Sequence, residues 1–432
     1  MIYLLITIIL FGIAIILFRC EPSLFFSPSM AVIIWIVYIL FNYTINQDYR
    51  VFSTVLFFIG FAISVFSLGS ISGYIINNNF FHPRNPSSKL KFIRAISGWH
   101  YLAIISSVLT LIGLAGLIHY SYQEFQLFNS VYSLLLLPQE FATDRYGGAQ
   151  YLPIELKLLS YMIYPTALSI GALVGGKFWK PLTRLIPIIF ALSYGIIYSS
   201  RTVVILTLVS LISAELSTRV IFSNSSKIQM KKVITTASLF IIGLPLIFIT
   251  LQWLRQGFSS DFVVNEMLQI ARASMTGSFS AFTQWFHHYD SGISYEWGKN
   301  TFAGPFELLG LTNRVQGFYL DFTEVGKSHI NIYTVFRGLL QDYGFIGSSI
   351  FLFLFGLICS IIFYQVKRGW IIGVPLLALM NGWILFSPII SLFVNNSIIG
   401  GYFLFFISSF YTLRPKSNIK FQLEYFEKSK PK

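Results

Sequence analysis

A run of polar side chains just before an apolar segment is the part of the sequence best suited to chemistry. It reads Ser328-His329-Ile330-Asn331-Ile332-Tyr333-Thr334-Val335-Phe336-Arg337 and continues to Gln341-Asp342-Tyr343-Gly344. If a helix begins at about Asn331, then Tyr333, Arg337 and Gln341 share one face. A guanidinium there offers a fork of donors that suits phosphate oxygens, and the imidazole of His329 can reach the same cavity. The alternative is an interfacial amphipathic helix with a capping Ser or His.

Two further arginines stand beside apolar runs. Arg201 follows Tyr198-Ser199-Ser200, and Arg255 follows Trp253-Leu254. A charge costs about 2.5–3.5 kcal/mol at the centre of a membrane helix and much less near the interface. Each arginine is therefore either an interfacial anchor that marks a helix end or a cation turned into the protein. At one depth, the pair can hold a pyrophosphate whose lipid tail stays in the bilayer.

Glu307 differs from its acidic neighbours because the sequence around it, Gly304-Pro305-Phe306 and Leu308-Leu309-Gly310, is apolar. A carboxylate shielded from water suits a general base. The other acidic residues of this region fit a solvated surface: Asp261, Glu266, Asp290, Glu296, Asp321, Glu324 and Asp342. His287-His288 lacks further ligands at metal spacing, and no glycine-rich loop precedes a helix. We therefore expect neither a metal nor a cofactor.

The composition places these residues in a membrane protein. Of 432 residues, 55% are hydrophobic and only 11% are charged, with a mean hydropathy of +0.69. Soluble domains carry roughly 25% charged residues. This excludes a cytosolic enzyme, a disulfide scaffold and a disordered chain. The net charge of +13 is then a topology signal in a lipid bilayer, and we expect no nucleic-acid partner.

The predicted fold class is all-α, a polytopic membrane protein with about eleven transmembrane helices. A spanning helix needs about 20 mostly apolar residues. The predicted spans are about 2–18, 24–45, 51–76, 99–120, 156–176, 185–199, 202–217, 233–253, 343–365, 370–387 and 392–412. The sixth and seventh are short, so one broken hairpin is the alternative for them.

Charge sets the predicted orientation. Most of the 30 Lys and Arg residues fall on one side of an eleven-span chain, and most of the 17 Asp and Glu residues fall on the other. Since cytoplasmic loops collect Lys and Arg, the N-terminus is expected outside and the C-terminus in the cytoplasm. The chain then divides into helices one to eight at 1–253, a large outward loop with short helices at 254–342, helices nine to eleven at 343–412, and a basic cytoplasmic tail at 413–432.

Three features together resemble the Wzy-type O-antigen polymerases, the oligosaccharide repeat-unit polymerases of bacterial envelopes. They are His329-x-Asn331-x-Tyr333-Thr334-x-x-Arg337 followed by Asp342-Tyr343-Gly344-x-x-Gly347, Ser200-Arg201-Thr202 at the head of an earlier helix, and the large outward loop between these motifs. The resemblance covers nearly the whole chain.

The resemblance implies an inverting, metal-independent glycosyltransferase with the GT-C-like fold shared with O-antigen ligases. Such an enzyme joins a glycan on undecaprenyl pyrophosphate to a new lipid-linked repeat unit at the periplasmic face of the bacterial inner membrane. A flippase and a chain-length regulator of the same pathway are the implied partners. The implied site uses Arg201, Arg255 and Arg337 for the pyrophosphate, His329 for the acceptor hydroxyl, and Asn331 and Tyr333 for orientation. Glu307 and Asp342 are the alternative bases.

Two other functions compete with a polymerase. An O-antigen ligase uses the same fold and donor, with lipid A–core as acceptor; the Tyr333-Thr334-x-x-Arg337 continuation favours the polymerase. A flippase or transporter of lipid-linked sugars predicts charges within the spans and short loops, and often an internal repeat. Here the spans are nearly free of charge, we find no internal repeat, and the polar residues gather at the outer face.

Overall fold

The chain is a multi-pass membrane protein built mainly of helices. The computed structural model describes residues 2–23, 26–45, 51–80, 89–125, 141, 152–198, 200–222, 249–250, 264–289, 295–312, 319, 321–325 and 328–411. Within these ranges, seven helices are long and apolar enough to cross a membrane, and three shorter apolar helices accompany them. An all-α polytopic fold was the prediction, and the helices agree with it.

The first half of the described chain holds nine helical elements. They are α1 (Ile2–Cys20), α2 (Ser27–Ile45), α3 (Ser53–Phe80), α4 (Lys89–Phe125), α6 (Ile154–Tyr161), α7 (Ile163–Gly175), the 3-10 turn η1 (Pro181–Arg184), α8 (Leu185–Ile197) and α9 (Arg201–Phe222). The second half holds α11 (Val264–His287), α12 (Ala303–Leu308), the strands β1 (Thr323–Val325) and β2 (Ser328–Ile330), α13 (Val335–Lys367), α14 (Gly373–Phe386), η2 (Leu392–Val394) and α15 (Asn396–Tyr411).

Ten of the eleven predicted spans coincide with these helices. The predicted span at 156–176 is the pair α6 and α7, and those at 185–199, 370–387 and 392–412 are the shorter helices α8, α14 and α15. The eighth predicted span, 233–253, lies almost wholly outside the described residues, so the count of eleven stays a prediction. Within the predicted outward loop, α11 is a long helix of 24 residues.

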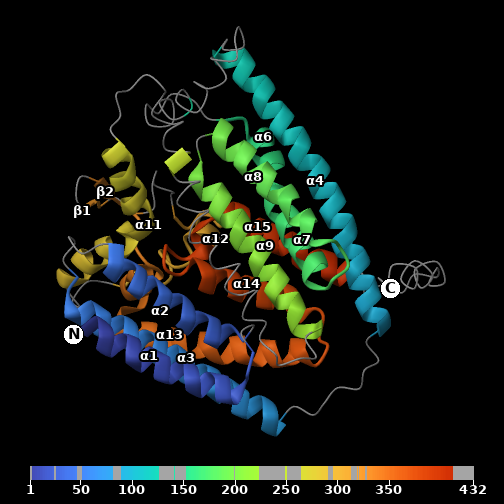
Figure 1. Cartoon of the computed structure of the whole chain (residues 1–432). Coiled ribbons are helices and arrows are strands. Elements are labelled where there is room, and N and C mark those ends of the chain that lie inside the picture. The colour runs from blue at the N-terminus through green and yellow to red at the C-terminus, as the bar shows by residue number, and fades with distance from the viewer. Residues whose placement is uncertain are drawn as a thin grey trace.

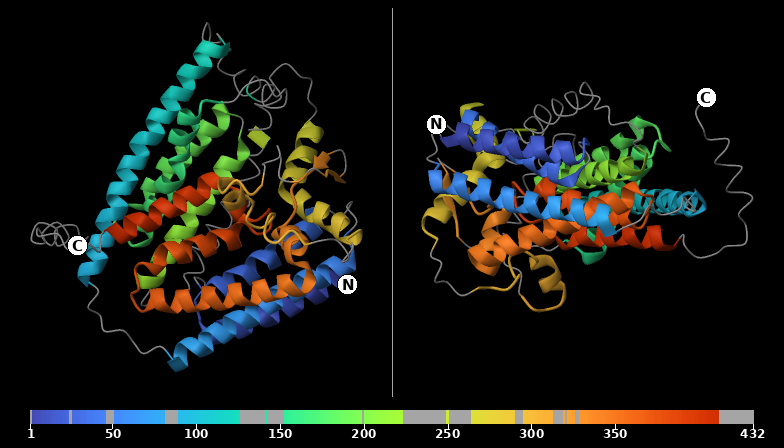
Figure 2. Two further views of the ribbon diagram at one scale, coloured as in Figure 1. Left: turned by 180° about the vertical axis from the view of Figure 1, so that it is seen from behind. Right: turned by 90° about the horizontal axis from the view of Figure 1, so that it is seen from below.

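The helices form two groups (Figure 1). In one group α1 packs on α2 and α3, and α2 and α3 pack on α13. In the other, α4, α6, α7, α8, α9 and α15 pack together, and α14 contacts both α2 and α9. The last turns of α9 and α13 lie close together, and the groups diverge from there, as the view from behind also shows (Figure 2). α11, α12 and the β1–β2 hairpin lie between the diverging ends, beside the start of α13.

Small residues allow α3 and α13 to approach closely. A Cβ atom at Gly356 of α13 would collide with the carbonyl oxygen of Phe66, and one at Gly69 of α3 with the carbonyl oxygen of Phe353. The Ser70 hydroxyl donates to the Gly356 carbonyl oxygen over 3.2 Å. Membrane helices associate through such small-residue contacts because lipid supplies no hydrophobic force between them. The two helices run parallel, since residues later in α3 meet residues later in α13.

Basic residues gather where α1, α3 and α13 end. The Lys367 ammonium pairs with the buried Glu21 carboxylate at 2.6 Å, and the Arg368 guanidinium donates to the Asn77 side-chain oxygen at 3.0 Å. Towards the end of α9, Glu215 accepts from both Arg184 and Arg219. The predicted basic side is therefore a single end of the helix bundle in the described residues. Arg337 lies near the opposite end of α13.

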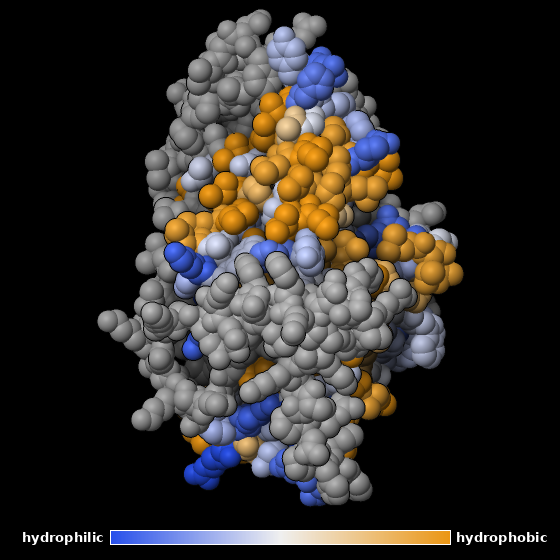
Figure 3. All heavy atoms as spheres, turned by 90° about the vertical axis from the view of Figure 1, so that its right-hand side faces the viewer, coloured by the Kyte–Doolittle hydropathy of each residue, from blue (hydrophilic) through white to orange (hydrophobic). Residues whose placement is uncertain are grey.

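Apolar side chains cover much of the coloured part of the face drawn in Figure 3. This face includes α4, which exposes Ile104, Ile105, Val108, Leu111 and Ile112. A surface of this kind would be unstable in water and is stable against lipid tails. It is the surface that a bilayer covers.

The contact between α3 and α13 gives a stability prediction. We expect Gly356→Leu to lower the free energy of unfolding by about 1–3 kcal/mol, because the new side chain collides with the backbone of α3 at Phe66. Gly12→Leu is the matched control, since Gly12 is exposed and a Cβ atom added there would meet no other atom within 4 Å. Thermal unfolding of the purified proteins in detergent measures both, and equal melting temperatures would contradict the packing described.

Candidate anion-binding site

A break in α13 creates the site. Gly344 has φ 64° and ψ −170°, which separates a short first segment from the long apolar remainder of the helix. This left-handed φ favours glycine, and a Cβ atom here would also meet the ring of Tyr295 at 2.5 Å. The helix begins at Val335, whose N–H donates to the Ser387 carbonyl oxygen over 3.0 Å. The prediction of a helix from about Asn331 is therefore wrong by one turn, because residues up to Ile330 pair in a β-hairpin.

Arg337 lies in the first segment of α13, enclosed by three aromatic rings. Its guanidinium carbon is 3.9 Å from the ring centroid of Tyr319, 4.0 Å from that of Tyr333 and 5.0 Å from that of Trp285. The rings of Tyr319 and Tyr333 meet edge to face at 5.1 Å. The faces of aromatic rings attract cations, more so where water is excluded. The cage thus holds a charged side chain that is only 2% exposed.

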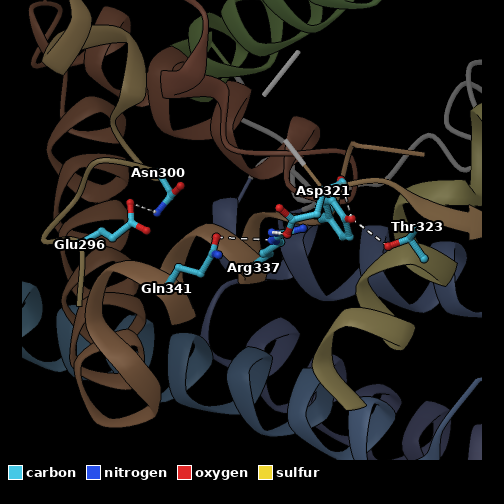
Figure 4. Close-up of polar contacts among 7 residues, drawn as sticks. Glu296, Asn300, Asp321, Thr323, Arg337 and Gln341 are labelled. Atoms are coloured by element: carbon cyan, nitrogen blue, oxygen red, sulfur yellow. Dashed lines mark hydrogen bonds and ion pairs between the residues drawn. The ribbon is translucent and has the colours of Figure 1, made fainter. Parts of the chain in front are cut away.

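Two side chains of the described residues bond to Arg337 (Figure 4). Nη2 pairs with Oδ2 of Asp321 at 2.5 Å, and Nε donates to the side-chain oxygen of Gln341 over 3.4 Å. Nη1 is buried and has no hydrogen-bond partner among the residues that the structure describes. An open donor on a buried cation is a place where an anionic oxygen can bind.

Tyr333 fixes the segment that faces Arg337. Its hydroxyl donates to the Asp321 carbonyl oxygen over 3.1 Å and shares a hydrogen bond of 2.8 Å with the Thr323 hydroxyl. Tyr319 forms another wall of the cage, and burial raises the pKa of its phenol well above the ordinary value, although Arg337 beside it acts in the opposite direction. The phenol of Tyr319 therefore serves as a neutral wall of the cage, and that of Tyr333 as a wall and a hydrogen-bonding group.

Asp342 holds the loop that crosses the break. One carboxylate oxygen accepts the N–H and the side-chain NH₂ of Asn300, each at 3.0 Å, and the other accepts the Thr301 N–H at 2.6 Å. The N–H groups of Glu296 and Trp297 donate to the carbonyl oxygens of Gln341 and Asp342, both over 3.2 Å. Carbonyls next to a helix break need such partners. Both oxygens of this fully buried carboxylate are thus engaged, which favours an anchor over a base.

The other predicted site residues in the described part of the chain, His329, Asn331 and Glu307, are not among the ring and hydrogen-bond partners of Arg337. His329 is exposed on β2, where it stands opposite Glu324 of β1. Asn331 is half-buried in the link between β2 and α13. Glu307 lies on α12 and is half-buried, and its carboxylate accepts from the Asn396 side chain at 2.7 Å. The apolar residues on either side of Glu307 predicted that its carboxylate is shielded from water, and the half-buried side chain is shielded only in part.

Arg201 is the first residue of α9 and is half-buried. It lies at the end of α9 remote from the Glu215 cluster, as Arg337 lies at the end of α13 remote from Lys367. Arg255, the third predicted cation, lies outside the described residues. In the described part of the chain no three His, Cys, Asp or Glu residues gather as metal ligands.

Three residues that contact Arg337 were not predicted from the sequence. Trp285 lies on α11, about 50 residues before Arg337, and its only sequence signal is the spacing of four residues from Tyr289. Asp321 was predicted to be a solvated surface residue, and its side chain is indeed 65% exposed. Tyr319 stands in a segment without periodicity. Neither residue type nor spacing in the sequence connects these residues to Arg337, and only the fold brings them into contact with it.

Comparison of the chain with models of protein families, with curated proteins and with solved structures found no match. A caged cation with an open donor, next to a membrane-spanning helix, suits an anionic headgroup whose apolar part stays in lipid.

The anchor role of Asp342 can be tested. We expect Asp342→Asn to lower the free energy of unfolding by about 1–3 kcal/mol, because the charge is lost and one of the two acceptor oxygens becomes an NH₂ group that faces an N–H or amide donor. Glu296→Gln is the control: Glu296 is exposed and accepts one side-chain hydrogen bond, from Asn300, so little change is expected. Thermal unfolding measures both. A stable Asp342→Asn protein without activity would instead identify Asp342 as the base.

Proposed function

We propose that this chain polymerises undecaprenyl-pyrophosphate-linked oligosaccharide repeat units into O-antigen or capsule-type polysaccharide. The observation that carries the proposal is the buried guanidinium of Arg337, held by aromatic rings, with one donor that no described residue accepts. It lies in the short segment before the break at Gly344, directly ahead of a long apolar helix. A lipid-linked pyrophosphate has this division, with a charged headgroup at the membrane surface and an apolar tail in the bilayer.

The chemistry needs few groups. The acceptor hydroxyl oxygen of a new repeat unit forms a bond to the anomeric carbon of the donor glycan with inversion. The bond from that carbon to the pyrophosphate oxygen breaks, and its electron pair leaves on undecaprenyl pyrophosphate. Cations that stabilise the developing charge therefore give the largest contribution to the rate. In this proposal Arg337, Arg201 and Arg255 supply them.

The proton of the acceptor hydroxyl needs a base. His329 is the proposed base, because its side chain is exposed at the hairpin that also carries Thr323, and imidazole is the side chain that most often acts as a general base. Asn331 and Tyr333 would orient this region. Glu307 and Asp342 are less suited, since both carboxylates already accept hydrogen bonds from the protein.

The membrane and its orientation belong to the same proposal. The end of the bundle that carries Lys367, Arg368, Arg184 and Arg219 would face the cytoplasm, because cytoplasmic ends collect basic residues. Arg337 would then lie at the periplasmic face of the bacterial inner membrane, with the N-terminus periplasmic and the C-terminus cytoplasmic. A flippase would deliver the repeat units there, and a chain-length regulator would act on the product.

The role of the arginines gives the first functional prediction. We expect Arg337→Ala and Arg201→Ala each to abolish chain extension while the protein still inserts and accumulates. Lys substitution should rescue poorly, because an ammonium does not reproduce the planar fork of a guanidinium. The size distribution of surface glycan, separated on a gel, measures extension. Normal-length polymer from either variant would remove that arginine from the site.

Deletion of the gene distinguishes a polymerase from its competitors. We expect single repeat units on the normal anchor and no ladder when surface and lipid-linked glycans are separated by size. Long polymer stranded on undecaprenyl pyrophosphate would instead indicate an O-antigen ligase. Repeat units trapped on the cytoplasmic side would indicate a flippase, and an unchanged profile would contradict any role in glycan assembly.

A further inference from the structure

The ion pair between Arg337 and Asp321 is strongly asymmetric. The Arg337 side chain is 2% exposed, whereas that of Asp321 is 65% exposed, although Nη2 and Oδ2 are only 2.5 Å apart. The cation is thus built into the protein, and its carboxylate partner reaches it from the solvent side. An exposed carboxylate gains only a modest free energy from such a pair, because water solvates it well when it leaves.

The Asp321 carboxylate forms a single hydrogen bond with the Arg337 guanidinium in the described structure. Only one oxygen of Asp321 bonds to Arg337, through Nη2, while Nη1 has no hydrogen-bond partner within the described ranges. A guanidinium can bind two oxygens of one phosphate group at once. Nη1 is itself buried, so a phosphate that takes the place of Asp321 accepts first from Nη2, and also from Nη1 where the groups that bury it give way.

The backbone at Asp321 is held independently of its carboxylate. The Asp321 carbonyl oxygen accepts from the Tyr333 hydroxyl, and the Thr323 hydroxyl bonds to the same phenol. β1 then pairs with β2 from Thr323 onwards. The side chain of Asp321 can thus turn away from Arg337 by rotating about its own bonds, without movement of the hairpin.

We propose that Asp321 is a resident counter-ion, which occupies the anion-binding edge of Arg337 and gives way to the pyrophosphate group of the ligand. The proposal deepens the proposed function and rests on it for the identity of the ligand. The carboxylate compensates the buried charge while the site is empty, and it lowers the apparent affinity because the anion must compete with it. It also favours release of the pyrophosphate-bearing product.

Binding of inorganic pyrophosphate to the full-length protein in nanodiscs tests the proposal. We expect Asp321→Asn to bind about tenfold more tightly than the wild type, and Asp321→Ala more tightly still, as for a site freed from an internal competitor. Glu324→Gln is the matched control, because it removes the same charge from the same hairpin at a position that stands opposite His329, and its affinity should equal that of the wild type. Arg337→Gln should abolish binding in every background.

Thermal unfolding separates this role from a merely structural one. Without ligand, Asp321→Ala should melt below the wild type, because a buried cation loses its partner, and saturating pyrophosphate should raise its melting temperature more than that of the wild type. If Arg337→Gln abolishes binding but the Asp321 variants bind pyrophosphate no more tightly than the wild type, the counter-ion proposal is wrong and the proposed function still stands. Folded proteins that bind no pyrophosphate in any variant would overturn the proposed function as well.

Discussion

The burial of a guanidinium among aromatic rings is the constraint on which the rest of the site depends. A charge in a water-poor setting is tolerated only where other groups replace the lost hydration. For Arg337, the faces of Tyr319, Tyr333 and Trp285 do so on its sides, and Asp321 does so at one edge. These four residues come from α11, from the hairpin region and from the link to α13. The cage therefore requires that distant parts of the chain fold together around a single cation.

The packing of the membrane helices positions Arg337 within this cage. Close packing of α3 against α13 fixes the long apolar part of α13, and the break at Gly344 sets the direction of its first segment. Asp342 then holds the loop at Asn300 and Thr301 against the break. Ser387, after α14, accepts the first N–H of α13 and the indole N–H of Trp35. The position of Arg337 is thus determined from both sides of the break.

Much of the fold could be predicted from the sequence because it is dictated by hydropathy. Long apolar runs have one outcome in a bilayer, and ten predicted spans coincide with helices in the described residues. Arg337 was also found from sequence, since an arginine beside a span needs an explanation. The start of its helix was not, because strand pairing between Glu324 and His329 overrides the helical spacing.

The partners of Arg337 could not be predicted, for a physical reason. Trp285 and Tyr319 are 52 and 18 residues away in sequence, and no local pattern reports a contact made only by tertiary folding. Asp342 was grouped with solvated acids, but the break at Gly344 turns it towards backbone N–H groups that a regular helix would never meet. Charge and periodicity identify which residues are unusual; only the fold shows what they touch.

Polymerisation is measured most directly with purified protein in proteoliposomes, with lipid-linked repeat units as the sole sugar substrate. We expect glycans of two or more repeat units on lipid, with one undecaprenyl pyrophosphate released for each new glycosidic bond, and no products with Arg337→Gln. Folded wild-type protein that forms no glycosidic bond, or that only moves the substrate across the bilayer, would contradict the proposed function.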